Sequence, residues 1–107
     1  MDLAIEKTFD GECWRVSLQG EIDLYNSAEL KSQLIQLMDE HIADIYVDCK
    51  WLDYIDSTGL GTLVAAFKNI KSHDKGMHLF NVKPSILKLF RITNLDKVFN
   101  ISAPKGG

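Results

Sequence analysis

The chain has 107 residues, 46% of them hydrophobic, and a formal net charge of −3 from 12 basic and 15 acidic residues. This length and composition predict one domain with a packed core, and the acidic balance argues against a nucleic-acid-binding protein. No run of about 18 apolar residues occurs, so a membrane-spanning helix is not expected.

The N-terminus and the cysteines favour a cytoplasmic protein. Residues 1–7 lack the charged and apolar regions of a signal peptide. Cys13 and Cys49 both lie in apolar, strand-like patterns. Such cysteines are typically small buried hydrophobes in a reducing compartment, with a structural disulfide as the alternative.

The first part of the chain predicts a hairpin, a connection and a helix. Residues 3–6 form a weak first strand, Asp10-Gly11 is typical of a hairpin turn, and residues 14–19 alternate as in a half-buried strand. We expect this strand to break at Gly20 and residues 21–25 to form a connection. Asn26 and Glu29 have the spacing of a capping box at a helix start. The core face of this helix is expected to contain Leu30, Leu34, Leu37, Met38 and Ile42.

The middle of the chain predicts a buried strand over residues 44–49, a loop over 50–55 and a second helix ending near Ser72-His73. Because a helix separates this strand from the preceding one, the two strands should be parallel. The core face of the second helix is expected to contain Leu60, Leu63, Val64, Phe67 and Ile70.

The last third predicts a strand over residues 77–82, a helix starting at Pro84 and a closing element over 95–101 that is either helical or extended. The fold class is therefore α/β, with a single mixed β-sheet, an N-terminal hairpin, parallel crossovers and covering helices. We expect one domain over residues 1–101 and a flexible C-terminal tail over 102–107.

Ser57 is the main candidate for a functional residue, because its hydroxyl lies where a loop turns into the second helix. A helix cap at Asp56 or Ser57 is the simplest structural explanation. It leaves unexplained Gly59 and Gly61, which each cost about 1 kcal/mol relative to alanine inside a helix. Either close packing within the protein or a docking partner that needs an uncluttered surface would account for them.

Acidic residues surround this serine in the sequence and in the expected sheet. Asp53 and Asp56 flank Ser57, and Glu21 and Asp23 lie in a connection expected at the same end of the sheet. These carboxylates form either an ordinary solvated surface or a docking face for a basic partner.

Three kinds of chemical site have weaker support. His41, His73 and His78 lack the spacing of metal ligands. The glycines after the strand do not complete a nucleotide-binding loop, and no cofactor is expected. Ser57 lacks the glycine two residues before it that a nucleophile elbow requires, and no histidine is placed as its base. We therefore do not expect an enzyme.

Two motifs together resemble the STAS-domain anti-sigma-factor antagonists of bacteria. The first is Asp56-Ser57-Thr58-Gly59-Leu60-Gly61, and the second, at the matching distance before it, is Gly20-Glu21-Ile22-Asp23. Residues 87–95 also resemble the family, with Asn94 where glycine is common. Asparagine also accepts left-handed backbone conformations, so this change is tolerable.

The resemblance implies a partner switch. The unphosphorylated antagonist binds an anti-sigma-factor serine kinase and so releases the sigma factor for transcription. The kinase phosphorylates the antagonist on the serine that corresponds to Ser57, and a metal-dependent serine phosphatase reverses this. The implied partner-binding residues are Glu21, Asp23, Asp56, Ser57, Thr58, Gly59, Leu60 and Gly61.

One alternative function remains open at this point. STAS-like domains also occur as interaction modules of transport or sensory complexes that are not phosphorylated and that bind another protein or a nucleotide. The serine favours the antagonist. The sequence alone names neither the sigma factor nor the oligomeric state.

Overall fold

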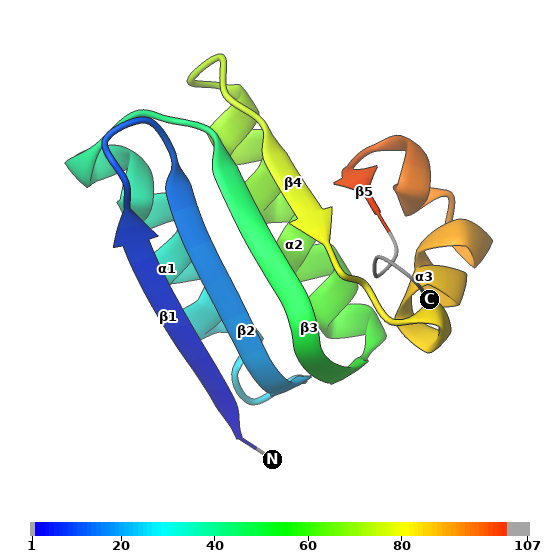
Figure 1. Cartoon of the computed structure of the whole chain (residues 1–107). Helices are drawn as coiled ribbons and strands as arrows, with labels where there is room; N and C mark the ends of the chain where they lie inside the picture. The colour runs from blue at the N-terminus through cyan, green and yellow to red at the C-terminus, as the bar shows by residue number, and fades with distance from the viewer. Residues whose placement is uncertain (1, 103–107) are drawn as a thin grey trace.

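The computed structural model describes residues 2–102, which form one five-stranded sheet with helices packed on it (Figure 1). The strands are β1 (Leu3–Phe9), β2 (Trp14–Ile22), β3 (Ile45–Ile55), β4 (Met77–Phe80) and β5 (Asn100–Ile101). The helices are α1 (Ser27–Glu40), α2 (Ser57–Lys71), α3 (Pro84–Ile92) and the short 3-10 helix η1 (Leu95–Lys97).

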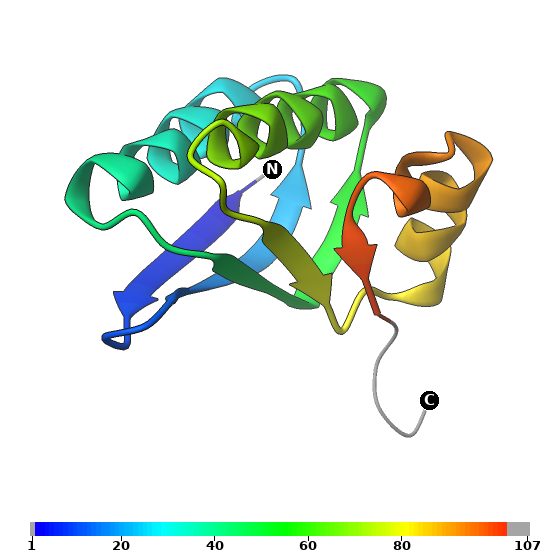
Figure 2. The same ribbon diagram turned by 90° about the horizontal axis from the view of Figure 1, so that it is seen from above.

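The sheet is mixed, as predicted. Its spatial order is β1-β2-β3-β4-β5, with β1 antiparallel to β2 and every later neighbouring pair parallel. Helices α1 and α2 cover one face, and α3 lies beyond β4 near β5 (Figure 2). Much of the other face of the sheet is therefore left without a helical layer.

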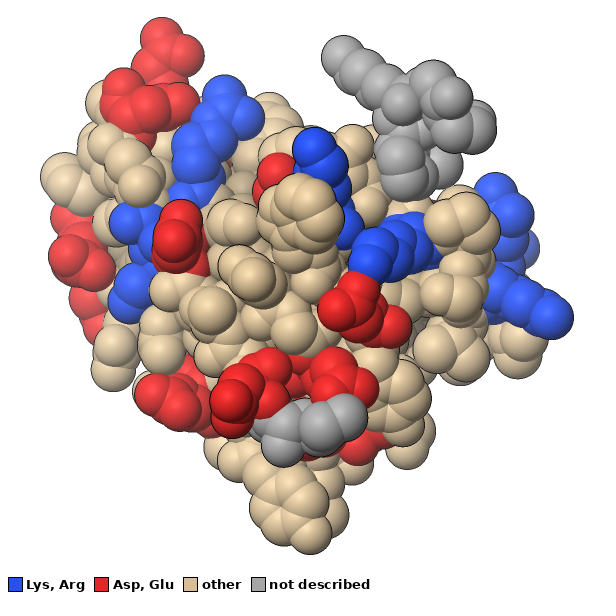
Figure 3. Space-filling model, turned by 60° about the horizontal axis from the view of Figure 1, so that its bottom comes forward, with Lys and Arg blue, Asp and Glu red and all other residues tan. Residues whose placement is uncertain are grey.

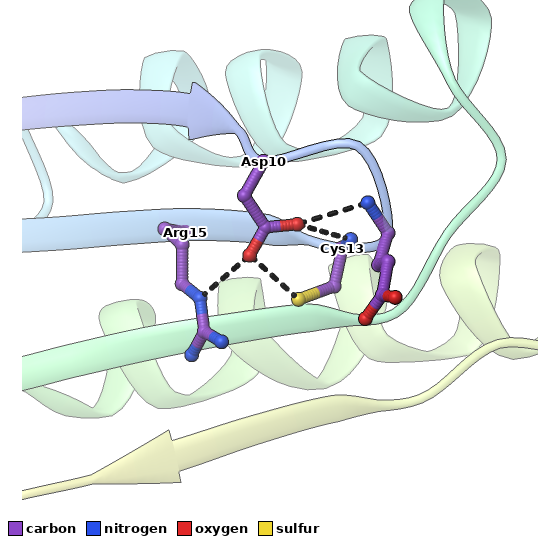
Figure 4. A network of polar contacts seen from close by, with 4 residues as sticks. Asp10, Cys13 and Arg15 are labelled. Atoms are coloured by element: carbon purple, nitrogen blue, oxygen red, sulfur yellow. Dashed lines mark hydrogen bonds and ion pairs between the residues drawn. The ribbon is translucent and has the colours of Figure 1, made fainter.

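The hairpin between β1 and β2 turns at Asp10-Gly11, as the sequence predicts. Gly11 has a φ of 95°, which favours glycine, and Asp10 Oδ1 accepts hydrogen bonds from the backbone N–H groups of Glu12 and Cys13 at 2.9 and 2.8 Å. Arg15 donates to the other carboxylate oxygen at 3.2 Å (Figure 4). The donors around Asp10, its two backbone partners foremost, hold the pKa of its carboxyl well below the usual range.

The core lies between the sheet and helices α1 and α2. The predicted helix faces are largely correct, and the fully buried side chains include Leu30, Leu34, Leu37, Leu63 and Ile70. Val64 and Phe67 are only half-buried and pack against the edge of this core. Ile42 was predicted wrongly: it lies beyond the end of α1 and is 58% exposed.

Each of the first four strands has a boundary that differs from the prediction: β1 continues beyond residue 6 to Phe9, and β4 ends at Phe80 rather than at residue 82. β2 does not break at Gly20 but continues to Ile22, with a shift of register between Gly20 and Glu21. Gly20 has a φ of 113°, and a Cβ there would lie 2.1 Å from the carbonyl oxygen of Asp2. β3 continues through the expected loop as far as Ile55.

The start of α1 is correct, but its capping is not. Asn26 is the N-cap residue, yet its side chain forms no hydrogen bond to the helix, so the capping box with Glu29 is absent. Asn26 instead accepts from the backbone N–H of Asp23 at 3.0 Å and donates to the carbonyl of Glu21 at 2.8 Å. The side chain stabilises the preceding loop rather than the helix.

The closing segment contains both of the forms that were expected, a turn of 3-10 helix and a short strand. Asn94 before η1 has a φ of 61°, in the left-handed region that asparagine accepts. Ser102 was expected to belong to the flexible tail, but its backbone bonds to that of Leu79 and Val82 at 3.0 and 3.1 Å. The rest of the expected tail, 103–107, lies outside the described residues, and the domain boundaries stay a prediction.

Candidate functional site

The candidate site lies where β2 and β3 end side by side. Ile22 pairs with Ile55 in the last register position, and the N–H of Asp56 donates to the carbonyl of Ile22 at 3.2 Å. Because the two strands are parallel, the loop after β2 and the start of α2 meet at the same edge of the sheet (Figure 1). The sequence predicted this meeting, although Glu21 is part of β2 rather than of a connection.

Asp56 connects the two halves of the site through its carboxylate. Its Oδ1 accepts from the N–H of Gly59 at 2.8 Å and caps the N-terminus of α2. Its Oδ2 accepts from the N–H of Leu24 at 3.1 Å, in the loop before α1. One side chain therefore satisfies a helix terminus and fixes the neighbouring loop against it.

Asp23 has a similar structural role inside that loop. Its Oδ1 accepts from the N–H groups of Tyr25 and Asn26 at 2.9 and 3.2 Å, and its carbonyl accepts from the N–H of Ser27 at 3.0 Å. These hydrogen bonds within the loop explain the aspartate at this position, and no contact with a binding partner is needed to explain it. They also hold the loop in one conformation, so its exposed side chains are preorganised.

The start of α2 has an exposed side and a buried side. Ser57, Thr58 and Gly61 are exposed, whereas Gly59 and Leu60 are buried. Ser57 is the first residue of the helix, where the first backbone N–H groups have no partner within the helix.

The two glycines of the motif have different explanations. A Cβ on Gly59 would come within 2.7 Å of side-chain carbons of both Ile22 and Ile55, so packing inside the protein requires glycine there. A Cβ on Gly61 would meet nothing within 4 Å. Of the two explanations given by the sequence, internal packing therefore applies to Gly59, and a docking surface remains the proposal for Gly61.

Acidic side chains gather at this end of the molecule. Figure 3, in which the bottom of the molecule as seen in Figure 1 is turned forward, shows several Asp and Glu side chains close together at this end. Asp53 is exposed and pairs with Lys83, which immediately precedes α3. Glu21 is half-buried and pairs with Tyr54 in the sheet, and Asp23, also half-buried, follows the end of β2. The site therefore offers mainly negative charge to a partner.

Two residues that the sequence did not indicate, Leu24 and Tyr25, lie in the loop that Asp56 fixes to the start of α2. Leu24 is 64% exposed and Tyr25 is 91% exposed, although both are large and apolar in character. Large exposed apolar side chains held by a rigid loop are common anchors of protein interfaces. Their position directly after Asp23 of the acidic motif was the only signal in the sequence.

Other reactive groups do not form a site in residues 2–102. Within this range no group of three or more His, Cys, Asp or Glu side chains is arranged to hold a metal ion. Cys13 and Cys49 are unpaired and buried, as predicted, and burial is the main cause that raises the pKa of the Cys13 thiol and raises that of Cys49 to about 12. None of the helices described combines the length and apolar character needed to cross a membrane.

Comparison with known proteins places this arrangement in a family. The STAS domain model matches residues 4–104. An anti-sigma-B factor antagonist from Staphylococcus aureus is 34% identical over 102 residues, which cover 95% of this chain and 94% of that protein. The corresponding protein of Staphylococcus epidermidis is 32% identical over the same length.

Solved structures share the fold at lower sequence identity. A candidate anti-sigma factor antagonist from Thermotoga maritima has a TM-score of 0.83 at 19% identity, covering 94% of this chain and 87% of that one. The Bacillus cell fate determinant SpoIIAA, in its phosphorylated form, has a TM-score of 0.72 at 18% identity, covering 95% and 93%. Its unphosphorylated form, an anti-sigma factor antagonist, has a TM-score of 0.68 at 18% identity, covering 91% and 97%.

The family model spans nearly the whole chain, and the two motifs at residues 20–23 and 56–61 lie together at one end of the sheet. The resemblance seen in these motifs is thereby confirmed. This chain belongs to the STAS domain family, in which its curated relatives are anti-sigma factor antagonists.

Proposed function

We propose that this protein is an anti-sigma factor antagonist that is switched by phosphorylation of Ser57. Unphosphorylated, it binds an anti-sigma-factor serine kinase and so releases a sigma factor. Phosphorylation by that kinase ends the binding, and a metal-dependent serine phosphatase restores it. The names of the staphylococcal relatives, which identify them as anti-sigma-B factor antagonists, support the same role here.

The observation that carries the proposal is the exposed Ser57 hydroxyl at the start of α2, beside a rigid loop that presents Leu24 and Tyr25. A kinase can reach this hydroxyl without unfolding the helix. The same surface is suited to docking, because Gly61 leaves room for a partner and the two exposed apolar side chains offer anchors. The carboxylates around it favour a partner with a basic face.

Phosphorylation would change this surface in two ways. A phosphoryl group adds about −1.5 to −2 charges at neutral pH and three acceptor oxygens. At Ser57 the first backbone N–H groups of α2 stabilise that charge, so the fold should tolerate the modification. A partner face fitted to a neutral hydroxyl among carboxylates would meet added negative charge and added bulk. We therefore infer direct obstruction, with little change in the backbone.

Thr58 is the competing acceptor, because it is exposed and adjacent to Ser57. The assignment to Ser57 rests on the position of the serine in the Asp56–Gly61 motif. The test is the intact mass of the protein after incubation with ATP, Mg²⁺ and an anti-sigma kinase encoded in the same genome, followed by peptide mapping. Thr58→Ala provides the matched control for Ser57→Ala.

We expect one phosphate on Ser57 that requires the kinase, persists in Thr58→Ala and is lost in Ser57→Ala. Phosphate on Thr58 would overturn the assignment of the residue. The absence of any phosphate, in a protein that still binds the kinase, would instead favour the alternative of an unphosphorylated STAS interaction module.

A further inference from the structure

Strand β1 is an outer strand of the sheet, and its free side pairs with no other strand among residues 2–102 (Figure 1). It pairs with β2 in unbroken register, from Leu3 opposite Gly20 to Phe9 opposite Trp14, and contains no proline. A continuous edge strand of this kind presents a row of main-chain N–H and C=O groups to which another strand can add.

The hydrogen bonds at the two ends of the hairpin determine which main-chain groups are free. The N–H of Glu21 donates to the carbonyl of Asp2 at 3.2 Å, and the N–H of Asp10 donates to the carbonyl of Cys13 at 3.1 Å. In an antiparallel pair, alternate residues direct their main-chain groups to the partner strand, so the even-numbered residues of β1 bond to β2. The groups directed outward belong to the odd-numbered residues: Leu3, Ile5, Lys7 and Phe9.

These four residues also share one face of the sheet, because successive side chains alternate between faces. It is the core face, since Lys7 lies opposite the buried Val16. The other three side chains are half-buried and pack against the edge of the core, whereas Lys7 is exposed. A lysine on an edge strand normally opposes pairing, because its charge would lose water in the new interface. A partner for this edge must therefore supply a carboxylate.

The neighbouring helix of the same chain carries a carboxylate in a suitable position. A small hollow of about 90 Å³ lies between β1 and the start of α1, and its lining consists of Leu3, Ile5, Asn26, Glu29 and Gln33. Glu29 is exposed, and its Oε1 accepts only a long hydrogen bond, 3.4 Å, from Nε2 of Gln33. Among the residues that the structure describes, neither Glu29 nor Lys7 forms an ion pair.

We propose that the edge of β1 is an interface with a second copy of this chain, paired antiparallel about a twofold axis at Ile5. Leu3 of each copy then lies opposite Lys7 of the other, and their outward main-chain groups exchange hydrogen bonds. Directly opposed side chains point to the same face, so Lys7 of one copy enters the hollow beside Leu3 of the other and pairs with Glu29 there. The symmetry forms this ion pair twice.

The charges on β1 favour this register over its neighbours. An axis at Glu6 or at Lys7 would place that residue opposite its own copy, and an axis at Ala4 would place Glu6 opposite Asp2. Like charges directly opposite each other on paired strands are destabilising. An axis at Ile5 instead places Glu6 opposite Ala4. Because Ser57 follows β3 and not β1, this interface does not depend on the proposed phosphorylation switch.

The test is sedimentation velocity of the full chain at increasing protein concentration. The test variants are Lys7→Glu, Glu29→Lys and the double variant that contains both changes. Lys88→Glu in α3 and Glu40→Lys at the other end of α1 are the matched controls, since both positions are exposed and carry the same changes of charge.

We expect a reversible monomer–dimer equilibrium whose dimer fraction rises with concentration. Each single charge reversal at Lys7 or Glu29 should weaken association at least tenfold, while the double variant and both controls should stay within about threefold of the unsubstituted protein. Amide hydrogen exchange by NMR should slow in the dimer at Leu3, Ile5 and Lys7. The N–H groups of the even-numbered residues, already bonded to β2, should change less.

A chain that stays monomeric at every concentration would overturn the proposal. So would a dimer that the single reversals leave unchanged, or a double variant that associates no better than the singles, because both results exclude pairing of Lys7 with Glu29. Protection that appears in another segment and not in β1 would show that the copies meet through a different surface, and would likewise overturn it.

Discussion

The carboxylate of Asp56 accepts a hydrogen bond from the backbone N–H of Leu24, 3.1 Å away, and so ties the loop before α1 to the start of α2. Its other oxygen caps α2 through the N–H of Gly59 at 2.8 Å. The proposed docking surface is built from both of these segments, and Ser57 follows Asp56 directly. One side chain therefore sets the relative positions of the apolar anchors and the serine.

Replacing Asp56 tests this double role. Asp56→Ala removes the cap of α2 and the tie to Leu24, and we expect the free energy of unfolding to fall by about 1–2 kcal/mol. Urea denaturation measures this loss. Asp39→Ala, at an exposed position in α1, should stay within about 0.5 kcal/mol of the unsubstituted protein. Equal stability of the two variants would show that the Asp56 contacts contribute nothing.

The two glycines of the motif provide a matched pair of substitutions in one helix. Gly59→Ala places a methyl group within 2.7 Å of Ile22 and Ile55, and we expect a loss of about 1–3 kcal/mol in the free energy of unfolding. Gly61→Ala enters open space and should raise it by about 1 kcal/mol through helix propensity. Urea denaturation of both variants checks the opposite signs.

Binding to the anti-sigma kinase provides a second test of the substitution at Gly61. If the docking surface needs the space at Gly61, the variant Gly61→Ala should bind the anti-sigma kinase more weakly even though it is more stable. Unchanged affinity in a calorimetric titration would show that the partner does not approach this position.

The local signals of the sequence predicted much of the fold. Asp10-Gly11 marked a turn by its chemistry, and the helical spacing of Leu34, Leu37 and Ile70 marked core faces, because both depend on a few neighbouring residues. The position of Ser57 at a helix start was predicted for the same reason.

Features that depend on distant residues were missed. The register between β2 and β3 shifts twice, so the alternation expected of a strand fails after Cys49 and β3 resembles a loop in the sequence. Gly20 looked like a strand end, whereas its role is a close approach to the carbonyl of Asp2. The exposure of Leu24 and Tyr25 depends on hydrogen bonds of the folded loop, which no local pattern encodes.

The hairpin carboxylate predicts a dependence of stability on acid. The pKa of Asp10 is lower in the folded protein than its ordinary value of about 3.9, chiefly because two backbone N–H groups donate to the ionised form. Its contribution to stability is therefore present above the unfolded pKa and is lost as the pH falls below about 4. Asp10→Asn should be less stable than the unsubstituted protein at pH 6.

Urea denaturation at pH 6, 4 and 3 measures this difference between the two proteins. We expect this difference in the free energy of unfolding to shrink as the pH falls. Protonation of Asp10 removes the charged carboxylate that the backbone N–H groups stabilise, and asparagine has no such charge at any pH. Glu12→Gln, on the same turn, is the control for a change of one charge. A difference that stays constant with pH would contradict the lowered pKa of Asp10.

Tyr25 is the residue of the site whose role is easiest to separate from folding. It is 91% exposed, so Tyr25→Ala should change the free energy of unfolding by less than about 0.5 kcal/mol. As an interface anchor it should contribute at least about 2 kcal/mol to kinase binding, a loss of roughly thirtyfold in affinity. Trp51→Ala, at an exposed aromatic residue in β3, is the matched control. Equal affinities of the two variants would remove Tyr25 from the docking surface.

Substitutions of Ser57 separate the effects of bulk and charge in the proposed switch. Ser57→Ala keeps the surface small and neutral, so it should bind the anti-sigma kinase at least as durably as the unphosphorylated protein and never be modified. Ser57→Asp adds one negative charge beside Asp56, and we expect at least tenfold weaker binding, less than the effect of a full phosphate.

A third variant, Ser57→Asn, has nearly the size of the aspartate variant without its charge. Calorimetric titration of all three against the kinase distinguishes the two causes. Weak binding by Ser57→Asp alone would assign the switch to electrostatic repulsion, and equally weak binding by Ser57→Asn would assign it to bulk. If Ser57→Asp bound as tightly as the unmodified protein, the charge of the phosphate would not be what releases the partner. Loss of binding in Ser57→Ala would show that the hydroxyl itself is an essential contact.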